Sequence, residues 1–524
     1  MVGNIFLQID TIIEEVISQF STEHNFDRVT QNTNIVWREP DGTSIRQFEF
    51  DNSQTGIKPE FYNMYNQTPY DFYKLFVTDN IMEHMVFQTN LYAEQVMNVR
   101  KKLKGHVKEW VPTTKAELEQ FLGLLLWMGL AKFPRLKSYW TTNILYANKI
   151  KEIMPRDRFE KLLQMWHFSD NQDNSLSNDK LRKITALTNK LLDRYKYVLI
   201  PGSDICIDET LVPFRGRLKF RQYIKNKKNK FGIKLYKLCT SGGYLYNLDI
   251  YCGNDCGKLG NASANVVMNL MKDLLDAGRT LYTDNYYTSV SLAAQLLERK
   301  THLVGTIRTN RKLNARDVVE KKLKRYEVFG QESNTGILLL KWRDTRDVLL
   351  LTTRHKNEVV TVRQRGKNIQ KPKAIVDYNK SKAYIDISDQ MKSYAHCLRR
   401  GRKWYRKLAV EILLGSTIVN AHLAYQEVTQ KKLQITEFRE QLSLALLGDK
   451  IPLFENNPPR EEHKLEEHTK TRCVVCYATV KKNLGRVQAQ SKTPRSKWQC
   501  SFCKKSYCVP CFFKVHHALK SINC

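Results

Sequence analysis

Apolar residues recur at helical spacing through the N-terminal third of the chain. The stretch from Arg158 to His167 is an example, because its apolar side chains fall on one helical face: Phe159, Leu162, Leu163 and Trp166. We therefore predict a mostly helical region over residues 61–202. The preceding residues, 1–60, are polar and show little periodicity, which predicts a weakly ordered region there.

The longest uninterrupted apolar run, Phe121–Ala131, is a predicted buried helix. It is well short of the roughly 20 residues that a membrane span needs. Thr114, with Glu117 three residues later, forms a capping-box pattern just before the run. Acidic residues interrupt the apolar residues near Met1, so no signal peptide is predicted, and we expect a protein that stays inside the cell without a membrane partner.

The periodicity changes from helices to strands at residue 203. Ile205 and Ile207 flank Cys206 in a strand that leads into Asp208. Six more strands and helices are predicted after it, with a hairpin turn between the first two: Lys234–Cys239, Tyr244–Tyr251, Ala264–Ala277, Thr280–Thr283, Val290–Lys300 and His302–Arg308. The order β-β-β-α-β-α-β over residues 203–310 predicts an α/β domain with a mixed sheet whose faces are covered by helices.

Residues 311–373 are rich in β-branched side chains and are predicted to form a β-rich insertion, with strands at Ile337–Trp342, Val348–Thr352 and Val359–Val362. Helical spacing returns in 374–398 and again in 399–450. A polar linker, 451–470, then precedes a cysteine-rich segment, 471–524.

The chain is strongly basic, with 85 Lys and Arg against 53 Asp and Glu and a formal net charge of +32. The charge is clustered, since ten basic residues and no acidic one lie between Thr210 and Leu248, and six of the nine residues Arg399–Lys407 are Lys or Arg. Such clusters are typical of proteins that bind nucleic acid, and double-stranded DNA is the partner that we expect.

Aspartates stand where predicted strands end and helices begin. Asp208 lies on a strand, Asp284 ends a later strand, and Asp386 and Asp389 stand three residues apart at a helix start. Two divalent cations about 3.5–4 Å apart, held by converging carboxylates, can stabilise the attacking and leaving oxygens of a phosphodiester displacement. The alternative is that these are surface aspartates at strand ends and helix caps.

The residues around these aspartates resemble the catalytic motifs of piggyBac transposases. Ile207–Arg217, with the sequence IDETLVPFRGR, is similar to the first motif of that family, and Tyr282–Ser289 is similar to the second. Asp377–Lys380, leading to Asp386–Met391, looks like the third. Shorter similarities at Trp166–Asn171 and Gly305–Arg311 extend the resemblance.

The resemblance implies an RNase H-like catalytic core, made of residues 203–310 and 374–398 and interrupted by the β-rich insertion. The helical parts, 61–202 and 399–450, would form a dimerisation and DNA-binding domain, and a homodimer is expected. In this arrangement Asp208, Asp284 and Asp386 bind two catalytic Mg²⁺ ions, and Asp389 assists them.

The implied reaction is cut-and-paste DNA transposition, with strand cleavage and strand transfer at transposon ends and insertion at TTAA-type target sites. One position departs from the family pattern, since Ala383-Tyr384 stand before Ile385 where the family usually has Gly-Gly before Val. A bulky pair there would shift Asp386. The alternative is therefore a domesticated, transposase-derived DNA-binding protein without catalytic activity.

The cysteine-rich segment has the spacing of zinc ligands, with three Cys-x2-Cys pairs followed by two histidines. We predict an interleaved cross-brace with two structural Zn²⁺ ions. The first is held by Cys473, Cys476, Cys508 and Cys511. The second is held by Cys500, Cys503 and His516, with His517 or Cys524 as the fourth ligand. The family resemblance implies that this domain reads transposon end DNA, and a RING-like or PHD-like module that binds a protein is the alternative.

Two basic runs are candidate DNA-binding segments. Their residues, with two arginines of the first motif, are Arg215, Arg217, Lys225, Lys227, Lys228, Lys230, Arg399, Arg400, Arg402, Lys403, Trp404, Arg406 and Lys407. Trp404 either stacks on a distorted base or buries itself at the start of a helix. The lysines near residue 228 either clamp phosphates or only solubilise a loop. Either run is also a potential nuclear import signal, so we expect nuclear localisation.

Overall fold

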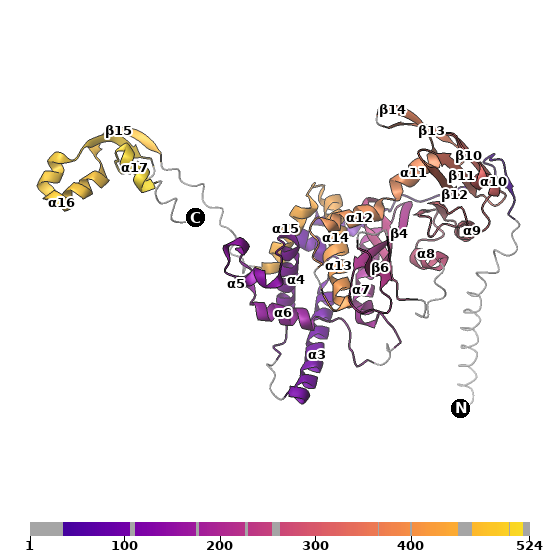
Figure 1. Ribbon diagram of the computed structural model, residues 1–524, viewed down its shortest axis with the longest axis horizontal. Helices are drawn as coiled ribbons and strands as arrows, with labels where there is room; N and C mark the ends of the chain where they lie inside the picture. Colours follow the sequence, from indigo (N-terminus) through magenta and orange to yellow (C-terminus); the bar gives the residue numbers. More distant parts are fainter. Residues whose placement is uncertain are drawn as a thin grey trace. The chain divides into compact units, whose positions relative to one another are not determined.

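The computed structural model of the chain describes residues 35–104, 110–173, 178–225, 229–253, 263–364, 366–398, 401–448, 464–501 and 503–516. They belong to two compact units, Met1–Lys450 and Ile451–Cys524, which are treated separately below. The fold of the first unit is mixed α/β, as predicted (Figure 1).

A ten-stranded mixed sheet forms the centre of the first unit, in the order β1-β10-β11-β12-β9-β8-β4-β6-β5, with β7 also paired to β6 (Figure 1). Its middle strands are β4 (Asp204–Pro213), β6 (Phe231–Thr240), β7 (Leu245–Ile250), β8 (Thr280–Thr283) and β9 (His302–Thr306). Strand β4 runs antiparallel to β6 and parallel to β8, and β8 runs parallel to β9. The predicted strands and helices of this region are therefore present, and short strand β5 (Gln222–Tyr223) is added at one edge.

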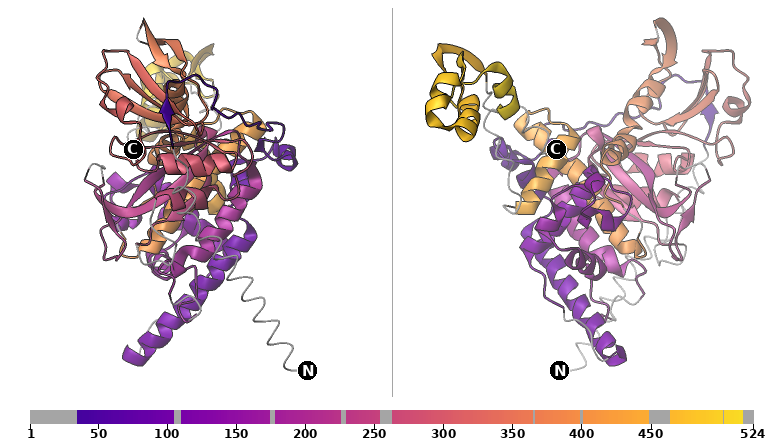
Figure 2. Two further views of the ribbon diagram at one scale, coloured as in Figure 1. Left: turned by 90° about the vertical axis from the view of Figure 1, so that its right-hand side faces the viewer. Right: turned by 60° about the vertical axis from the view of Figure 1, so that its left-hand side comes forward.

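Two of the three strands predicted for the insertion extend this same sheet, as β11 (Leu338–Arg343) and β12 (Asp347–Thr352), and β12 pairs with β9. Strand β10 (Val328–Ser333), which was not predicted, pairs with β11. The third predicted strand, Val359–Val362, lies outside this sheet. The hairpin β13 (Val359–Gln364) and β14 (Lys367–Pro372) forms a separate two-stranded sheet, which projects from the unit (Figure 2).

Part of the polar N-terminal region is built into the sheet, although the sequence predicts weak order for it. Strand β1 (Trp37–Arg38) pairs with β10, and β2 (Gly56–Ile57) pairs with β3 (Leu199–Ile200). Both oxygens of buried Glu332 accept backbone N–H groups from this segment, those of Gly42 and Ser44, at 2.9 Å. The contacts with β10 join residues about 290 positions apart, and β2 and β3 form a separate two-stranded sheet, so local periodicity carries no sign of either pairing.

The two faces of β4 have different neighbours. Ile205 and Ile207 point into an apolar core shared with α8 (Ser263–Met271) and α9 (Val290–Glu298). The opposite face is covered by α11 (Lys373–Ser381) and α12 (Tyr384–Ser393), and there the Cys206 thiol lies 3.6 Å from the carbonyl oxygen of Lys382. The chain after the insertion therefore returns to the strand that carries Asp208.

Helices make up the rest of the first unit, and the region predicted to be helical is helical. They are α2 (Pro69–Lys74), α3 (Asp79–Lys104), α4 (Lys115–Leu130), α5 (Ile150–Ile153), α6 (Arg156–Met165), α7 (Arg182–Val198), α10 (Arg316–Glu320), α13 (Trp404–Glu411), α14 (Thr417–Thr429) and α15 (Ile435–Leu447), with short turns η3 (Pro59–Met64), η4 (Leu136–Trp140), η5 (Ile144–Tyr146) and η7 (Ser241–Gly243). A π-helical turn, η8 (Ile412–Ser416), joins α13 to α14.

The predicted cap of the apolar run is present, since the Thr114 hydroxyl accepts the Glu117 N–H at 3.3 Å at the start of α4. The stretch Trp404–Thr429 is long and apolar enough to cross a membrane by composition, but 94% of its most apolar window is buried inside the unit. Packing in the helical core accounts for its apolar side chains.

The second unit is small. It contains β15 (Leu465–Arg472), α16 (Val474–Lys492), β16 (Arg495–Cys500) and α17 (Val509–His516), and β15 pairs antiparallel with β16. The buried side chains of Cys500, Tyr507 and Phe512 form its core. Since so little apolar surface is buried, this unit needs a further source of stability.

Candidate active site and zinc site

Strand pairing brings Asp208 and Asp284 together. In the parallel pair β4–β8, Ile207 is opposite Thr283, and each aspartate is the next residue of its strand. Carboxylate oxygens of Asp208, Glu209 and Asp284 lie within 4.8 Å of one another, close enough to hold a metal ion. The middle of β4 and the residue that follows its parallel neighbour β8 thus supply oxygen ligands of the kind that Mg²⁺ prefers.

A tight turn fixes Asp284. Its carboxylate accepts the Tyr286 N–H at 2.9 Å, and its carbonyl oxygen accepts the Thr288 hydroxyl at 2.8 Å. Burial raises the pKa of Asp284, and the negative charge of Glu209 raises it further. Ionising this carboxyl is therefore costly until a cation balances the cluster.

Glu209 belongs to this acidic group, and the sequence did not predict it. The Tyr287 hydroxyl donates to it at 3.3 Å, and the Lys234 ammonium lies 3.9 Å away. Neighbouring residues of a strand point to opposite faces, so Glu209 would be expected to point away from Asp208. The one feature of the sequence that could have identified Glu209 as a member of the group is its position next to Asp208.

Asp386 lies outside the group of three acids formed by the described residues. It stands exposed in the first turn of α12. Burial raises the pKa of the Cys206 thiol, and the charges of Asp208, Asp386 and Asp284 add to this effect. The charges of all three aspartates therefore act on one thiol of β4, although Asp386 does not belong to the cluster that the other two share with Glu209.

The two residues that depart from the family pattern are accommodated at the start of α12. The Tyr384 side chain is buried, and its hydroxyl donates to the Ser381 hydroxyl oxygen at 3.2 Å. The backbone of α12 also approaches Gly243 so closely that a β-carbon there would lie 2.9 Å from the Ser388 nitrogen. Since Gly243 has a φ of 92°, both strain and space require glycine at this contact.

Asp389 is held by cations in a chain of buried charges. Its carboxylate lies 3.1 Å from the Lys237 ammonium and 2.7 Å from the Lys392 ammonium, and it accepts the Thr210 hydroxyl at 2.8 Å. Lys392 also contacts Glu411 at 2.6 Å. Although burial opposes ionisation, Lys237 and Lys392 hold the pKa of Asp389 far below its usual range. Its charge is therefore balanced within the protein.

The described residues of the basic runs have different surroundings. Trp404 begins α13 and is partly buried, with its ring edge-on to Phe220 at 5.3 Å. The Arg406 guanidinium donates to the carbonyl oxygen of Trp166 at 2.8 Å and to that of Gln164, so it is tied to the end of α6. Some other cations of the basic runs are exposed or undescribed. Arg402 and Lys403 are exposed.

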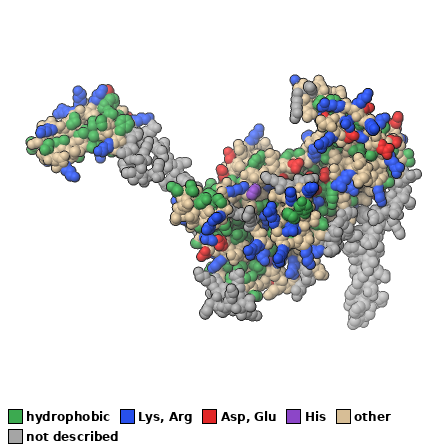
Figure 3. Space-filling model, viewed as in Figure 1, with side chains coloured by type: hydrophobic (Ala, Val, Ile, Leu, Met, Phe, Trp, Pro, Cys, Tyr) green, Lys and Arg blue, Asp and Glu red, His purple; other side chains and the backbone are tan. Residues whose placement is uncertain are grey.

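Lys227, Lys228, Arg399 and Arg400 lie outside the described residues. Lys and Arg side chains are common on the face of this unit seen in Figure 3.

The two arginines of the first motif lie in the loop after β4. Arg215 is exposed, and its carbonyl oxygen accepts the Arg221 guanidinium at 3.0 Å. Arg217, Lys225 and Lys230 are also exposed. Their side chains are accessible to a partner.

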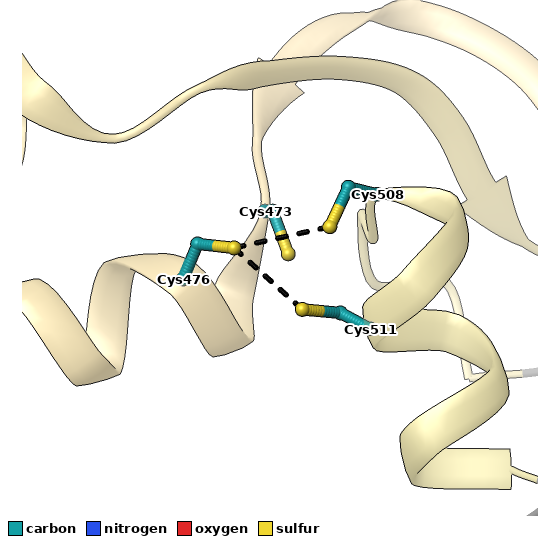
Figure 4. A group of neighbouring side chains, drawn as sticks. All are labelled: Cys473, Cys476, Cys508 and Cys511. Carbon is teal, nitrogen blue, oxygen red and sulfur yellow. Dashed lines mark hydrogen bonds between the residues drawn. The ribbon is translucent and has the colours of Figure 1, made fainter.

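Four cysteines of the second unit come together from β15–α16 and α17 (Figure 4). They are the four that the sequence assigns to the first zinc ion: Cys473, Cys476, Cys508 and Cys511. The Cys476 sulfur lies 3.8 Å from that of Cys508 and 3.6 Å from that of Cys511. A tetrahedral Zn²⁺ with bonds of about 2.3 Å to sulfur requires sulfur separations of about 3.8 Å, so the cluster fits this ion.

The second predicted zinc site is only partly described. Cys503 lies near Tyr507, with its sulfur 3.6 Å from the hydroxyl oxygen. Burial raises the pKa of Cys503, but hydrogen bonds from the Tyr507 hydroxyl, the Lys505 backbone and Cys500 together lower it below its usual value. His517, Cys524 and the side chain of His516 lie outside the described part of the chain. The fourth ligand of this site therefore stays a prediction.

Comparisons with known proteins agree with these features. The profile of a family described as Transposase IS4 matches residues 68–422. PiggyBac transposable element-derived protein 3 of Homo sapiens is 26% identical over 400 residues, which cover 72% of this chain and 64% of that protein. PiggyBac transposable element-derived protein 2 of Homo sapiens is 23% identical over 465 residues, which cover 81% of this chain and 75% of that protein. The chain thus spans less than two thirds of the first relative.

A solved structure has a similar fold. It is the cryo-EM structure of the piggyBac transposase synaptic complex with hairpin DNA, which matches with a TM-score of 0.68 at 23% identity. The match covers 87% of this chain and 98% of that chain. At this level of identity the likeness establishes the fold.

Proposed function

Since the chain belongs to the piggyBac-type transposase family, described as Transposase IS4, we propose that it is an active DNA transposase that cuts strands at transposon ends and joins them to TTAA-type target sites. The observation that carries this proposal is the meeting of Asp208, in the middle of β4, with Asp284, which directly follows the parallel neighbouring strand β8. An RNase H-like core is part of the proposal, and the mixed sheet with α8 and α9 on one face and α12 on the other supports it.

The acidic cluster suits hard divalent cations. All three of its members offer oxygen ligands, and the pKa of Asp284 is raised by burial first and by the negative charge of Glu209 in addition. We assign Asp208 and Asp284, with Asp386 from α12, as ligands of two Mg²⁺ ions. When bound, such ions stabilise charge on the attacking and leaving oxygens of a phosphodiester displacement.

The residues of the chain have distinct tasks in this mechanism. The turn after β8 orients the Asp284 carboxylate, because the Tyr286 N–H donates a hydrogen bond to one of its oxygens. Helix α12 brings Asp386 toward β4. Asp389 acts as a positioning residue in this scheme, because Lys237 and Lys392 already balance its charge. Its ion pairs join α12 to β6 and so set the position of Asp386.

A second candidate is a domesticated DNA-binding protein without catalytic activity. The observation in its favour is that Asp386 stands outside the group formed by Asp208, Glu209 and Asp284. In that case the basic surface and the zinc-binding unit bind DNA, and the acidic cluster does not catalyse DNA cleavage.

Other parts of the molecule have supporting roles in the proposal. The cysteine cluster holds a structural Zn²⁺, and the second unit reads the transposon ends. Two copies of the chain act together on two ends, in the nucleus. The exposed cations Arg215, Arg217 and Arg402 contact DNA phosphates.

Cleavage of DNA tests the enzyme proposal against the alternative. The substrate is a DNA hairpin, and the comparison is between the wild type and Asp284→Asn, with Glu440→Gln, an exposed change on α15, as control. We expect Mg²⁺-dependent nicking by the wild type and the control, and loss of nicking with retained DNA binding in Asp284→Asn. Equal nicking by all three, or none by the wild type, would contradict the enzyme proposal.

A further inference from the structure

A cavity of about 1040 Å³ opens among α3, α4, α6 and the start of α13. Buried apolar side chains from α4 and α6 line its inner part, among them Leu125, Met128 and Phe159. Its size lies at the upper end of the range of about 300–1000 Å³ that is typical of small-molecule sites. The cavity is therefore large enough for a ligand with a flat apolar part.

Five cations also line the cavity: Lys132, Arg402, Lys403, Arg406 and Lys407. No Asp or Glu is among the described lining residues, and within the described chain none of the five forms an ion pair with a carboxylate. Burial lowers the pKa of Lys407 and of Arg406, because the charged form loses contact with water. An anion in the cavity would offset this cost.

One lining cation is fixed in place by the protein. The Arg406 guanidinium donates to the carbonyl oxygens of Trp166 and Gln164, and it lies 5.9 Å from the centre of the Tyr92 ring. Its position in the lining is therefore set before any ligand binds.

We propose that this cavity binds one unpaired nucleotide of a DNA strand, with its base against the apolar wall and its phosphate among the cations. The inference rests on the proposed function, which makes DNA the substrate. A nucleotide joins a flat aromatic base to an anionic phosphate, and proteins bind extrahelical bases by this combination of apolar or aromatic contact and positive charge. An apolar peptide would leave the five cations unbalanced.

Helix α13 links the cavity to the ion pairs behind the acidic cluster. Val410 lines the cavity, and the next residue, Glu411, contacts Lys392, which in turn contacts Asp389. A nucleotide in the cavity therefore contacts the same helix that holds α12 in place.

Binding of full-length protein to two duplexes tests this inference. One duplex of mixed sequence carries a single extrahelical 2-aminopurine, and the other is identical but fully paired; both are measured without Mg²⁺. We expect about tenfold tighter binding of the first, together with a change in 2-aminopurine fluorescence, since contact between a base and such a surface contributes this much. Equal affinity of the wild type for the two duplexes would overturn the proposal.

Variants locate the effect in the cavity. Leu163→Trp places a larger side chain in the cavity from α6. The ratio of affinities for the extrahelical and the paired duplex should then fall to about one, while affinity for the paired duplex stays within about twofold. Arg402→Glu reverses the charge of an exposed lining cation, so it should weaken binding of both duplexes and also reduce the preference for the extrahelical one, whereas Lys151→Glu on α5 should leave the preference unchanged. A preference that survives both cavity variants would place the nucleotide elsewhere and refute the proposal.

A poly-glutamate peptide is the competing occupant. If it binds with the same sensitivity to Leu163→Trp and displaces the extrahelical duplex, the cavity is a site for acidic peptides and the proposal is wrong. Failure of catalysis is a separate outcome, because DNA cleavage does not enter these measurements. A protein that prefers the extrahelical base but never cuts DNA would retain this inference and lose the proposed function.

Discussion

The carboxylate of Asp389 lies 3.1 Å from the ammonium of Lys237, whose side chain is only 1% exposed. The two residues come from α12 and β6, and their contact closes a chain of charges that continues through Lys392 to Glu411. This chain attaches the helix that carries Asp386 to the strand next to Asp208. It joins elements far apart in sequence and gives the candidate active site its framework.

Substitution of Asp389 should destabilise the fold. In Asp389→Asn, Lys237 keeps its charge in a buried position without a carboxylate partner, and removing one partner of a buried pair costs about 3–5 kcal/mol. Urea unfolding of the first unit should report a loss of this size. Glu160→Ala, which removes an exposed pair with Arg156 at 2.8 Å, should cost about 0–1 kcal/mol. Similar losses in the two variants would show that the charges at Asp389 do not support the fold.

The stability of the metal-free protein should depend on Asp284 in a definite direction. A carboxyl with a raised pKa binds its proton more tightly in the folded state, so the free energy of unfolding falls as pH rises from the ordinary value of 3.8 through the raised pKa. Without metal at pH 7, Asp284→Asn should therefore melt higher than the wild type, and the difference should shrink below pH 3.8.

Magnesium should reverse this order, because it binds the wild-type cluster and stabilises the folded state by mass action. Calorimetry with and without MgCl₂ measures both effects, with Glu440→Gln as the control. An Asp284→Asn variant that melts lower than the wild type without metal would contradict the account of this carboxyl.

Zinc removal should unfold the second unit. Four cysteine sulfurs at tetrahedral spacing can hold one ion, and zinc binding contributes on the order of 10 kcal/mol to folding in small domains. Chelation, or Cys476→Ser, should make residues 464–516 sensitive to protease and lower the zinc content measured by elemental analysis. Cys397→Ser, in the first unit, should leave the zinc content unchanged. Protease resistance after complete zinc removal would refute a structural role for the metal.

Affinity for DNA should fall steeply with salt. Each phosphate contact contributes about 0.9 to the slope of the logarithm of affinity against the logarithm of salt concentration. Lys403→Ala removes one exposed cation and should reduce the slope by about this amount, whereas Lys151→Ala should not. Fluorescence anisotropy across a tenfold range of NaCl provides the measurement, and a flat response of the wild type would exclude a phosphate-binding surface.

Local sequence patterns predicted the elements that carry the aspartates. The alternation of Ile205 and Ile207 around Cys206 identified β4, and the short apolar run before Asp284 identified β8. The spacing of Cys473 and Cys476 likewise indicated the cysteine cluster. These features depend on spacings of two to four residues, so they can be recognised in a single sequence.

Long-range contacts were beyond the reach of such patterns. The contact of Lys237 with Asp389 joins residues 152 positions apart. In the sequence, Lys237 is one of several cations in a basic stretch, and nothing distinguishes it from the others. No local pattern indicates the pairing of Trp37 with Ser333 either. Glu209 was missed because strand alternation directs it away from Asp208, whereas its longer side chain reaches back to the same cluster.

Manganese binding tests the central claim most directly, since Mn²⁺ replaces Mg²⁺ at oxygen sites and is visible by anomalous X-ray scattering. Crystals of the full chain soaked in MnCl₂ should show an anomalous peak between the carboxylates of Asp208 and Asp284, and Asp208→Asn should abolish it. If the wild type shows no peak there, or if Asp208→Asn retains one, the aspartates do not form a cation site and the assignment of a metal-dependent transposase is contradicted.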